Sequence, residues 1–139
     1  MKYLLVTNVI SEVSKHDKAD ANVVAWYNSV EQDSVCLSVL VIGEIRAGIE
    51  KLRVDRPKRA SDFERRLILT IDLFADRIIS IDRRVAERWG RLNAERKRAA
   101  VDALLAATAW VHGLVMVTRN IRNFADTDVA CLNPFEFRH

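Results

Sequence analysis

The segment VDALLAATAWVHGLVMVTRN, residues 101–120, decides the fold class, because it joins a helix, a strand and a polar turn in one short stretch. Residues 101–111 are rich in Ala and Leu, which predicts a compact helix packed on most of its sides. Gly113 follows at the position where a glycine commonly ends a helix. The apolar run 114–117 then predicts a brief buried strand, and Thr118, Arg119 and Asn120 come directly after it. A helix that leads into such a strand is typical of an α/β fold.

Four further apolar runs predict strands of the same kind, and helical patterns separate most of them. We expect strands at residues 3–6, 35–38, 78–81 and 129–132, and helical stripes at residues 23–30, 40–49, 63–74 and 85–92. Asp20 and Asp82 are the predicted N-caps of two helices, and residues 53–60, which include Pro57, are the predicted long loop or helix break. Strands joined through helices lie parallel with right-handed crossovers. The sequence therefore predicts a three-layer α/β domain with a short-stranded, mainly parallel sheet.

Length and composition indicate one globular domain, residues 1–139. Half of the residues are apolar, with only four Gly and two Pro, which excludes a disordered or collagen-like chain. The two cysteines, Cys36 and Cys131, are interpreted as reduced core thiols of a cytosolic protein. The N-terminal apolar run is too short for a signal peptide and no run is long enough to cross a bilayer, so we expect a cytoplasmic protein with no membrane contact.

Positive charge is clustered in two stretches of the chain. The sequence carries 22 basic and 19 acidic residues, a net charge of +3. Residues 51–66 hold seven basic and three acidic side chains, and residues 83–98 hold seven basic and two acidic ones. Such clustering favours a polyanionic partner, because phosphate contacts release counterions. It also fits ordinary solvated helix faces, so charge alone leaves both interpretations open.

Polar residues follow three of the predicted strands. Thr7 and Asn8 come after the first strand, Glu44 lies about one turn inside the helix after the second, and Asn120 follows the fourth. Asp102 opens the apolar helix that leads into that fourth strand. Because the carboxyl ends of parallel strands meet at one crevice, we expect Glu44, Asp102 and Asn120 to gather at one edge of the sheet.

Glu44 and Asp102 each have a plain interpretation beside the functional one. Asp102 fits a first-turn acid that is stabilised by the helix dipole, and Glu44 fits an exposed helix position. Together, two converging carboxylates suit Mg²⁺, which takes its remaining ligands from water and phosphate. The scattered histidines exclude an ordinary zinc site, and the sequence contains no phosphate-binding GxxxxGK[ST] loop, no GxGxxG and no GxSxG.

The chain resembles the PIN-domain ribonucleases, specifically the VapC-like toxins of bacterial type II toxin–antitoxin modules, including the FitB-like branch. The matching stretches fall in family order over nearly the whole chain: LLVTNVISE at 4–12, LS at 37–38, GEIRAG at 43–48, DALLAATA at 102–109, VTRN at 117–120 and LNPF at 132–135. The resemblance implies a single PIN-like domain in which clustered acids hold Mg²⁺, or Mn²⁺ in its place, and direct water at an RNA phosphodiester.

Roles carry over from this resemblance residue by residue. Glu44 and Asp102 match two acids of the family and are assigned to metal binding and catalysis, and Asn120 of the polar fourth motif is assigned to catalysis. Substrate binding is assigned to the remaining polar residues at the strand ends: Thr7, Asn8, Thr118 and Arg119.

Val6 departs from the family pattern. The first motif normally reads Leu-Leu-Asp-Thr-Asn, and Val6 stands where its acid is expected. A β-branched residue finishing a buried strand fits strand propensity well. On the family interpretation, however, a central metal ligand is missing, so we expect an intact fold with impaired chemistry. Two origins fit: a change introduced or selected to abolish toxicity, or natural decay.

Two functions of different classes therefore remain. The first is a Mg²⁺-dependent endoribonuclease toxin with an inactivating substitution, and the second is a non-catalytic module that binds RNA or an antitoxin peptide. Metal-dependent cleavage by a Val6→Asp variant separates the two. A small-molecule α/β enzyme is a third possibility, and it needs a pocket that no motif indicates.

The expected partners are RNA, a VapB-like antitoxin and a second copy of the chain. A homodimer is expected because members of the family usually form dimers, and because Trp26 and Trp110 lie in apolar stretches of the sequence. The apolar helices at residues 39–49 and 63–74 offer a groove for an amphipathic antitoxin helix. An antitoxin Arg would pair with the acidic cluster. The antitoxin complex is expected to be a higher hetero-oligomer.

Overall fold

The short apolar runs form a five-stranded sheet in which all neighbouring strands are parallel. A computed structural model of the chain describes residues 1–138, and its strand order is β3-β2-β1-β4-β5. The strands are β1 (Tyr3–Leu5), β2 (Val35–Ser38), β3 (Ile78–Ile79), β4 (Val115–Val117) and β5 (Cys131–Leu132). All five predicted strands are confirmed, four of them shorter than the apolar runs that predicted them.

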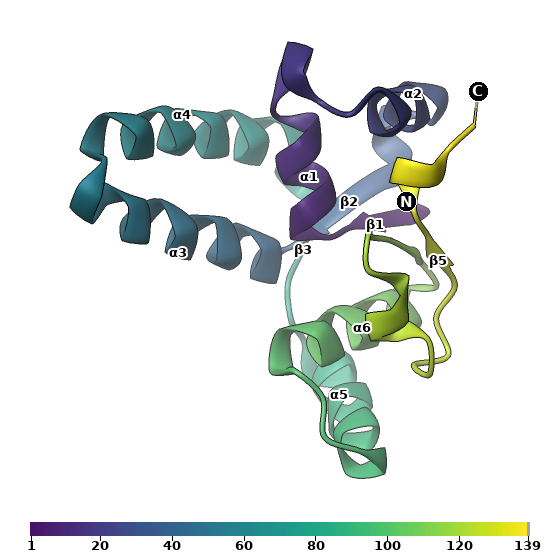
Figure 1. Ribbon diagram of the computed structural model, residues 1–139. Helices are drawn as coiled ribbons and strands as arrows, with labels where there is room; N and C mark the ends of the chain where they lie inside the picture. The colour runs from purple at the N-terminus through teal and green to yellow at the C-terminus, as the bar shows by residue number, and fades with distance from the viewer. Residues whose placement is uncertain (139) are drawn as a thin grey trace.

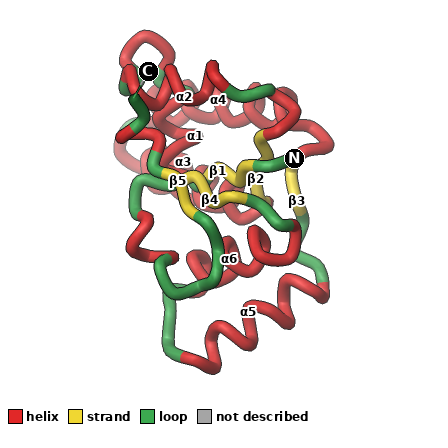
Figure 2. Tube along the Cα trace, turned by 90° about the vertical axis from the view of Figure 1, so that its right-hand side faces the viewer, coloured by secondary structure: helices red, strands yellow, loops and turns green. Residues whose placement is uncertain are grey.

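Helices cover both faces of this sheet, which confirms the three-layer arrangement. They are α1 (Thr7–Val13), α2 (Ala21–Ser29), α3 (Val39–Asp55), α4 (Pro57–Phe74), α5 (Arg83–Glu95) and α6 (Ala100–His112). Helices α1, α2 and α4 lie on one side of the sheet and α5 and α6 on the other (Figures 1 and 2). Helix α3 runs outward from the sheet edge and packs along α4.

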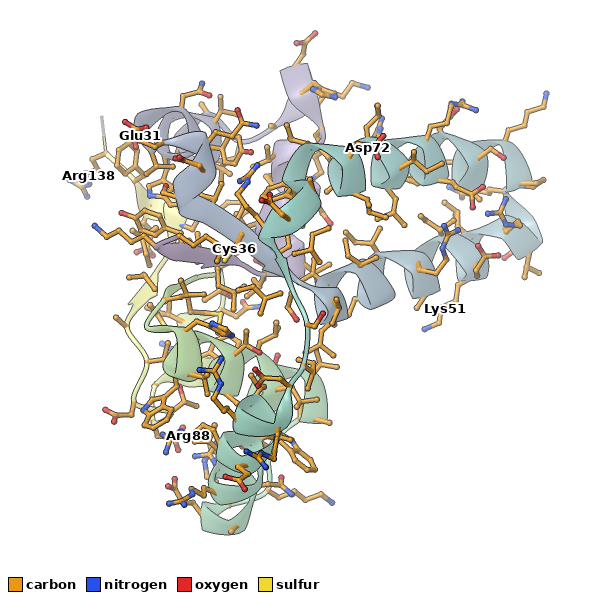
Figure 3. The ribbon with its side chains drawn as sticks, turned by 180° about the vertical axis from the view of Figure 1, so that it is seen from behind. Glu31, Cys36, Lys51, Asp72, Arg88 and Arg138 are labelled. Carbon is orange, nitrogen blue, oxygen red and sulfur yellow. The ribbon has the colours of Figure 1, made fainter. Side chains whose placement is uncertain are left out.

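The core lies between these layers and is formed by the strands together with the helix faces that cover them. Leu4, Leu5 and Leu37 are fully buried, because strands covered on both faces have no polar side. Cys36 is buried there as well, as a free thiol (Figure 3). Trp26 is 2% exposed and packs edge-on against Tyr3, with ring centroids 5.3 Å apart. Trp26 therefore belongs to the core, and its apolar surroundings give no support to the expected homodimer.

The predicted helix ends at Asp20, Asp82 and Gly113 are confirmed by hydrogen bonds or by a backbone angle. The Asp20 carboxylate accepts hydrogen bonds from the first backbone amides of α2, and that of Asp82 accepts one from the amide of Val85 in α5. Gly113 follows α6 with φ at 64°, a left-handed conformation that favours glycine.

Residues 53–60 contain the predicted helix break but no long loop. Helix α3 continues to Asp55, a single residue, Arg56, breaks the helix, and Pro57 is the first residue of α4. Pro suits that position because its missing N–H has no partner in the first helical turn. The two helices form an α3–α4 arm that projects from the domain, with Lys51 on its outer part (Figure 3). None of the described helices has the length and apolar character needed to span a bilayer.

Candidate active site

Three neighbouring strands end at one edge of the sheet. β1 lies between β2 and β4, parallel to both. Val6 follows β1, Ser38 ends β2 and Thr118 follows β4. Both hydroxyls bond to nearby backbone: Ser38 Oγ accepts from the Leu40 amide at 3.1 Å, and Thr118 Oγ1 accepts from the Asn120 amide at 3.1 Å. The edge is the one at which functional groups collect in parallel sheets.

Glu44 is positioned at this edge by Thr7. It lies in the second turn of α3, which begins where β2 ends. Thr7 is the first residue of α1, and its Oγ1 donates to Glu44 Oε1 at 2.5 Å. This bond links the N-terminal turns of two helices. Because Glu44 is otherwise exposed, its carboxylate stays accessible to water, a cation or a substrate.

Asp102 approaches the edge from the opposite layer. It is the third residue of α6 and is partly buried. Burial raises the pKa of its carboxyl, and the negative charge of Glu44 raises it further. Charges act on each other strongly only at short range. The charge of Glu44 therefore acts on Asp102, and the expected shared cation site of the two acids stays a prediction.

Val6 follows β1 and belongs to the buried core. Its side chain is 5% exposed, and its amide donates to the carbonyl of Val117 at 3.1 Å. Val6 is also the N-cap residue of α1, in extended conformation and without a side-chain cap bond. Valine is among the poorest N-caps, whereas Asp and Asn are among the best. An acid here would therefore cap α1 as well as extend the acidic edge.

The turn after β4 is held by side chains from two other segments. Asn8 Oδ1 accepts from the Arg119 amide at 3.3 Å, and Asn133 Nδ2 donates to the Arg119 carbonyl at 3.4 Å. The Arg119 guanidinium lies over the Phe135 ring, 4.5 Å from its centroid. A cation–π contact of this kind limits how far the guanidinium can move. Arg119 is thus an exposed but oriented cation beside the acidic edge.

The donor set suits a hydrated hard cation. Within residues 1–138, no three His, Cys, Asp or Glu side chains come together as a metal cluster. Glu44 and Asp102, whose charges act on one another, both supply oxygen donors. Mg²⁺ is commonly held by one or two carboxylates, with water and substrate phosphate as its other ligands. The raised pKa of Asp102 also means that added positive charge would be favourable at this site.

The apolar grooves lie beside the acids rather than over them. The larger has a volume of about 750 Å³ and lies between α1 and α4, with Ile10, Phe63 and Leu67 in its lining and Ile45 contributed by α3. A second of about 500 Å³ lies between α1, α2 and α4. The groove was expected between residues 39–49 and 63–74, and both of these helices line the larger groove. Helix α1 completes it, and the second groove opens on the α1 and α2 side of α4.

The structure gives hydrogen-bond partners to several residues that were assigned to the site from the sequence. Thr7 and Asn8 were assigned to substrate binding, and the structure gives them Glu44 and Arg119 as hydrogen-bond partners. Asn120 is exposed after Thr118 at the same edge, and its catalytic role stays a prediction. Sequence reasoning missed Asn133 and Phe135 as supports of Arg119. Their only signal was their place directly after the last strand.

Comparison with known proteins places the chain in a family. The sequence matches the PIN domain over residues 3–130. It is 36% identical over 137 residues to toxin FitB of Neisseria gonorrhoeae, covering 95% of this chain and 97% of that protein. It is 30% identical over 139 residues to a VapC ribonuclease of Sinorhizobium fredii, covering 96% and 97%.

Solved structures agree with the sequence matches. The crystal structure of FitAcB from Neisseria gonorrhoeae superimposes with a TM-score of 0.87 at 34% identity, covering 97% of this chain and 99% of that one. A toxin–antitoxin complex from Klebsiella pneumoniae gives a TM-score of 0.73 at 25% identity, covering 98% and 100%. This chain therefore belongs to the PIN-domain family, in the branch that contains FitB and the VapC ribonucleases.

Proposed function

We propose that the chain is the toxin of a type II toxin–antitoxin module, a Mg²⁺- or Mn²⁺-dependent endoribonuclease whose cleavage is slowed by Val6. The observation that carries the proposal is that Thr7 holds Glu44 at the carboxyl edge of the sheet, where the charge of Glu44 also acts on Asp102. Relatives that span nearly the whole chain bear the names toxin and ribonuclease. Action on cellular RNA implies that the protein works in the cytoplasm.

The side chains divide the chemistry between them. Glu44 and Asp102 would hold the cation, which when bound neutralises phosphate charge and makes water more acidic. Thr7 keeps the Glu44 carboxylate oriented through its hydrogen bond. Arg119, fixed over Phe135, offers a guanidinium that pairs with an RNA phosphate. Asn120 adds a polar group from the same turn.

Val6 weakens this site in two physical ways. With valine at this position the edge has two carboxylates, Glu44 and Asp102, in place of the expected three. The attraction for a divalent cation is therefore weaker. Val6 also places a buried apolar side chain where a ligand oxygen is expected. A cation beside this side chain would lose water ligands without gaining a protein ligand, which is unfavourable. The fold is unaffected, because valine suits the end of a buried strand.

Growth assays test the proposed activity in cells. Expression of the Val6→Asp variant without antitoxin should arrest growth and degrade RNA, and Asp102→Asn added to that variant should abolish both effects. The alternative, a non-catalytic RNA- or antitoxin-binding module, predicts that neither variant cuts RNA. Intact RNA and normal growth on expression of folded Val6→Asp protein would favour that alternative.

The antitoxin is proposed to dock on α4. The Klebsiella relative was solved as a toxin–antitoxin complex, and α4 here leaves Leu69 and Leu73 exposed at 68% and 50%. Both leucines line the 500 Å³ groove with Tyr27 and Phe74. An amphipathic helix fits such a groove through apolar residues at helical spacing. An antitoxin Arg reaching the nearby acids would compete with the cation.

A further inference from the structure

One carboxylate, Asp126, joins two segments that flank the candidate site. Arg96 donates to it twice, from Nε to Oδ2 at 2.6 Å and from Nη2 to Oδ1 at 3.0 Å. Arg98 Nη2 lies 3.4 Å from the same Oδ2. Both arginines lie in the connection between α5 and α6, and Asp126 lies in the loop that begins after Asn120. We call Arg96, Arg98 and Asp126 the Asp126 clasp.

Arg98 makes the clasp more than a surface ion pair. Its side chain is 5% exposed, and it donates to the carbonyl of Leu92, one of the last carbonyls of α5, which have no partner within the helix. Glu95 lies 3.5 Å away, on the same helix. Asp126 is therefore the opposite charge that the loop after Asn120 supplies to Arg98. Arg98 is nearly buried whereas Asp126 is 49% exposed, so loss of Asp126 would leave a buried guanidinium with only Glu95 as a nearby opposite charge.

The loop that carries Asp126 is itself firmly anchored. Phe124 is 2% and Thr127 1% exposed, and Thr127 Oγ1 donates to the Phe124 carbonyl at 2.7 Å. Arg88 of α5 (Figure 3) donates to the Thr127 carbonyl at 3.4 Å. The clasp thus fixes the α5–α6 connection to a buried part of the molecule.

The start of α6 depends on that connection. Its N-cap residue, Ala99, has no side chain that can cap the helix. The first backbone bond of the helix runs from the Ala103 amide to the Ala99 carbonyl at 3.0 Å. Asp102 lies inside this uncapped first turn, where helices open most easily. Something outside the helix has to hold the turn in place for Asp102 to stay near Glu44.

We propose that Asp126 is a positioning residue for Asp102: the clasp holds the first turn of α6 so that the Asp102 carboxylate faces Glu44. The inference rests on the proposed function only in treating Asp102 as a cation ligand. A purely structural role is the opposing interpretation. It predicts a general loss of stability without a specific change at the start of α6.

Amide hydrogen exchange of the unaltered chain and of Asp126→Asn tests the proposal. The matched control is Asp128→Asn, an exposed acid in the same loop with φ at 63°, a conformation that Asn tolerates. At a temperature where all proteins are folded, Asp126→Asn should speed exchange of the Ala103 and Leu104 amides by about tenfold. Exchange at residues 106–109 should not change, and the control should match the parent. Arg96→Gln, which removes only the exposed half of the clasp, should give a smaller effect.

A second measurement uses Mn²⁺ binding in the Val6→Asp background. Added Asp126→Asn should weaken Mn²⁺ binding by about 10- to 100-fold, as loss of outer supports of metal ligands commonly does, and Asp126→Glu should regain part of it. Equal exchange at the start of α6 in Asp126→Asn and Asp128→Asn, or unchanged Mn²⁺ affinity beside a lowered Tm, would overturn the proposal. Failure of Val6→Asp itself to bind Mn²⁺ would count against the proposed function instead, and the exchange result would still decide the role of Asp126.

Discussion

At position 6 a single side chain affects both a helix end and the candidate cation site. Val6 begins α1 without a side-chain cap, and an N-cap Asp or Asn is worth about 0.5–2 kcal/mol over an apolar residue. Against this stands the burial of a valine side chain, worth about 1.5–3 kcal/mol. The carboxylate of Asp adds repulsion from Glu44 and Asp102, which Asn does not.

Comparison of Val6→Asp with Val6→Asn isolates the carboxylate, because both residues cap a helix and have the same shape. Without metal, Val6→Asn should be the more stable of the two in urea unfolding. Added Mn²⁺ should stabilise Val6→Asp by mass action and leave Val6→Asn unchanged. Equal stability of the two variants with and without Mn²⁺ would contradict a shared acidic site.

Asp102 gives a pH-dependent prediction. Burial and Glu44 raise its pKa above the ordinary value of 3.8, so the native state keeps a proton that the unfolded chain has lost. Its contribution to stability therefore falls as the pH rises from the ordinary to the raised pKa, and stays low above it. Asp102→Asn should therefore gain stability relative to the metal-free parent as the pH rises above the ordinary pKa of 3.8, and the gain should be small because the group is partly solvated. Parallel unfolding curves at all pH values would contradict this.

At the scale of the elements, the α3–α4 arm is held by a small apolar core and an ion-pair network. Ile49, Ala60 and Leu67 form a separate buried cluster. Glu64 of α4 pairs with Arg46 at 2.5 Å and with Arg53 at 3.1 Å. Leu67→Ala should cost about 2–5 kcal/mol, whereas Glu64→Gln should cost much less because its ion pairs are solvated. Denaturant titration of both variants measures the difference, and a larger cost for Glu64→Gln would show that charge holds the arm.

Elements were predictable wherever a local signal was strong. The strands followed from apolar runs, and α5 from the cap at Asp82. Pro57 was assigned to a long loop or a helix break without a choice between them, because a proline that begins a helix and one that interrupts it look alike in sequence. The expectation that Glu44 and Asp102 share one edge followed from the rule that parallel strands end together, and it stays a prediction. The Thr7 bond to Glu44 and the Asp126 clasp join residues 37 and 30 positions apart, and no periodic pattern announces such contacts.

At the scale of the whole molecule, the exposed apolar face of α4 predicts where the antitoxin binds. Leu69→Glu with Leu73→Glu should prevent co-purification with the co-expressed antitoxin, because charges would be buried in an apolar interface. Val54→Glu, at an 83% exposed apolar residue near the end of the arm, is the matched control and should leave the complex intact. Retention of the complex by the double variant would place the antitoxin elsewhere.

Self-association is a separate property of the molecule. Trp110 is 47% exposed with Arg88 over its ring at 4.3 Å, and exposed aromatic residues beside arginine are common in interfaces. We expect a homodimer at micromolar concentration in light scattering, which Trp110→Ala should weaken. A monomer at that concentration, without antitoxin, would contradict the expectation.

The most direct test of the account is the rate of RNA cleavage by three purified proteins: the present chain, Val6→Asp and Val6→Asn. Each is assayed on total RNA in Mg²⁺ and again with the metal removed by EDTA. The account predicts rapid cleavage by Val6→Asp in Mg²⁺ only, and slow or absent cleavage by the other two. Cleavage by the Val6 protein as fast as by Val6→Asp would show that the carboxylate at this position is dispensable, and the account of the active site would be wrong.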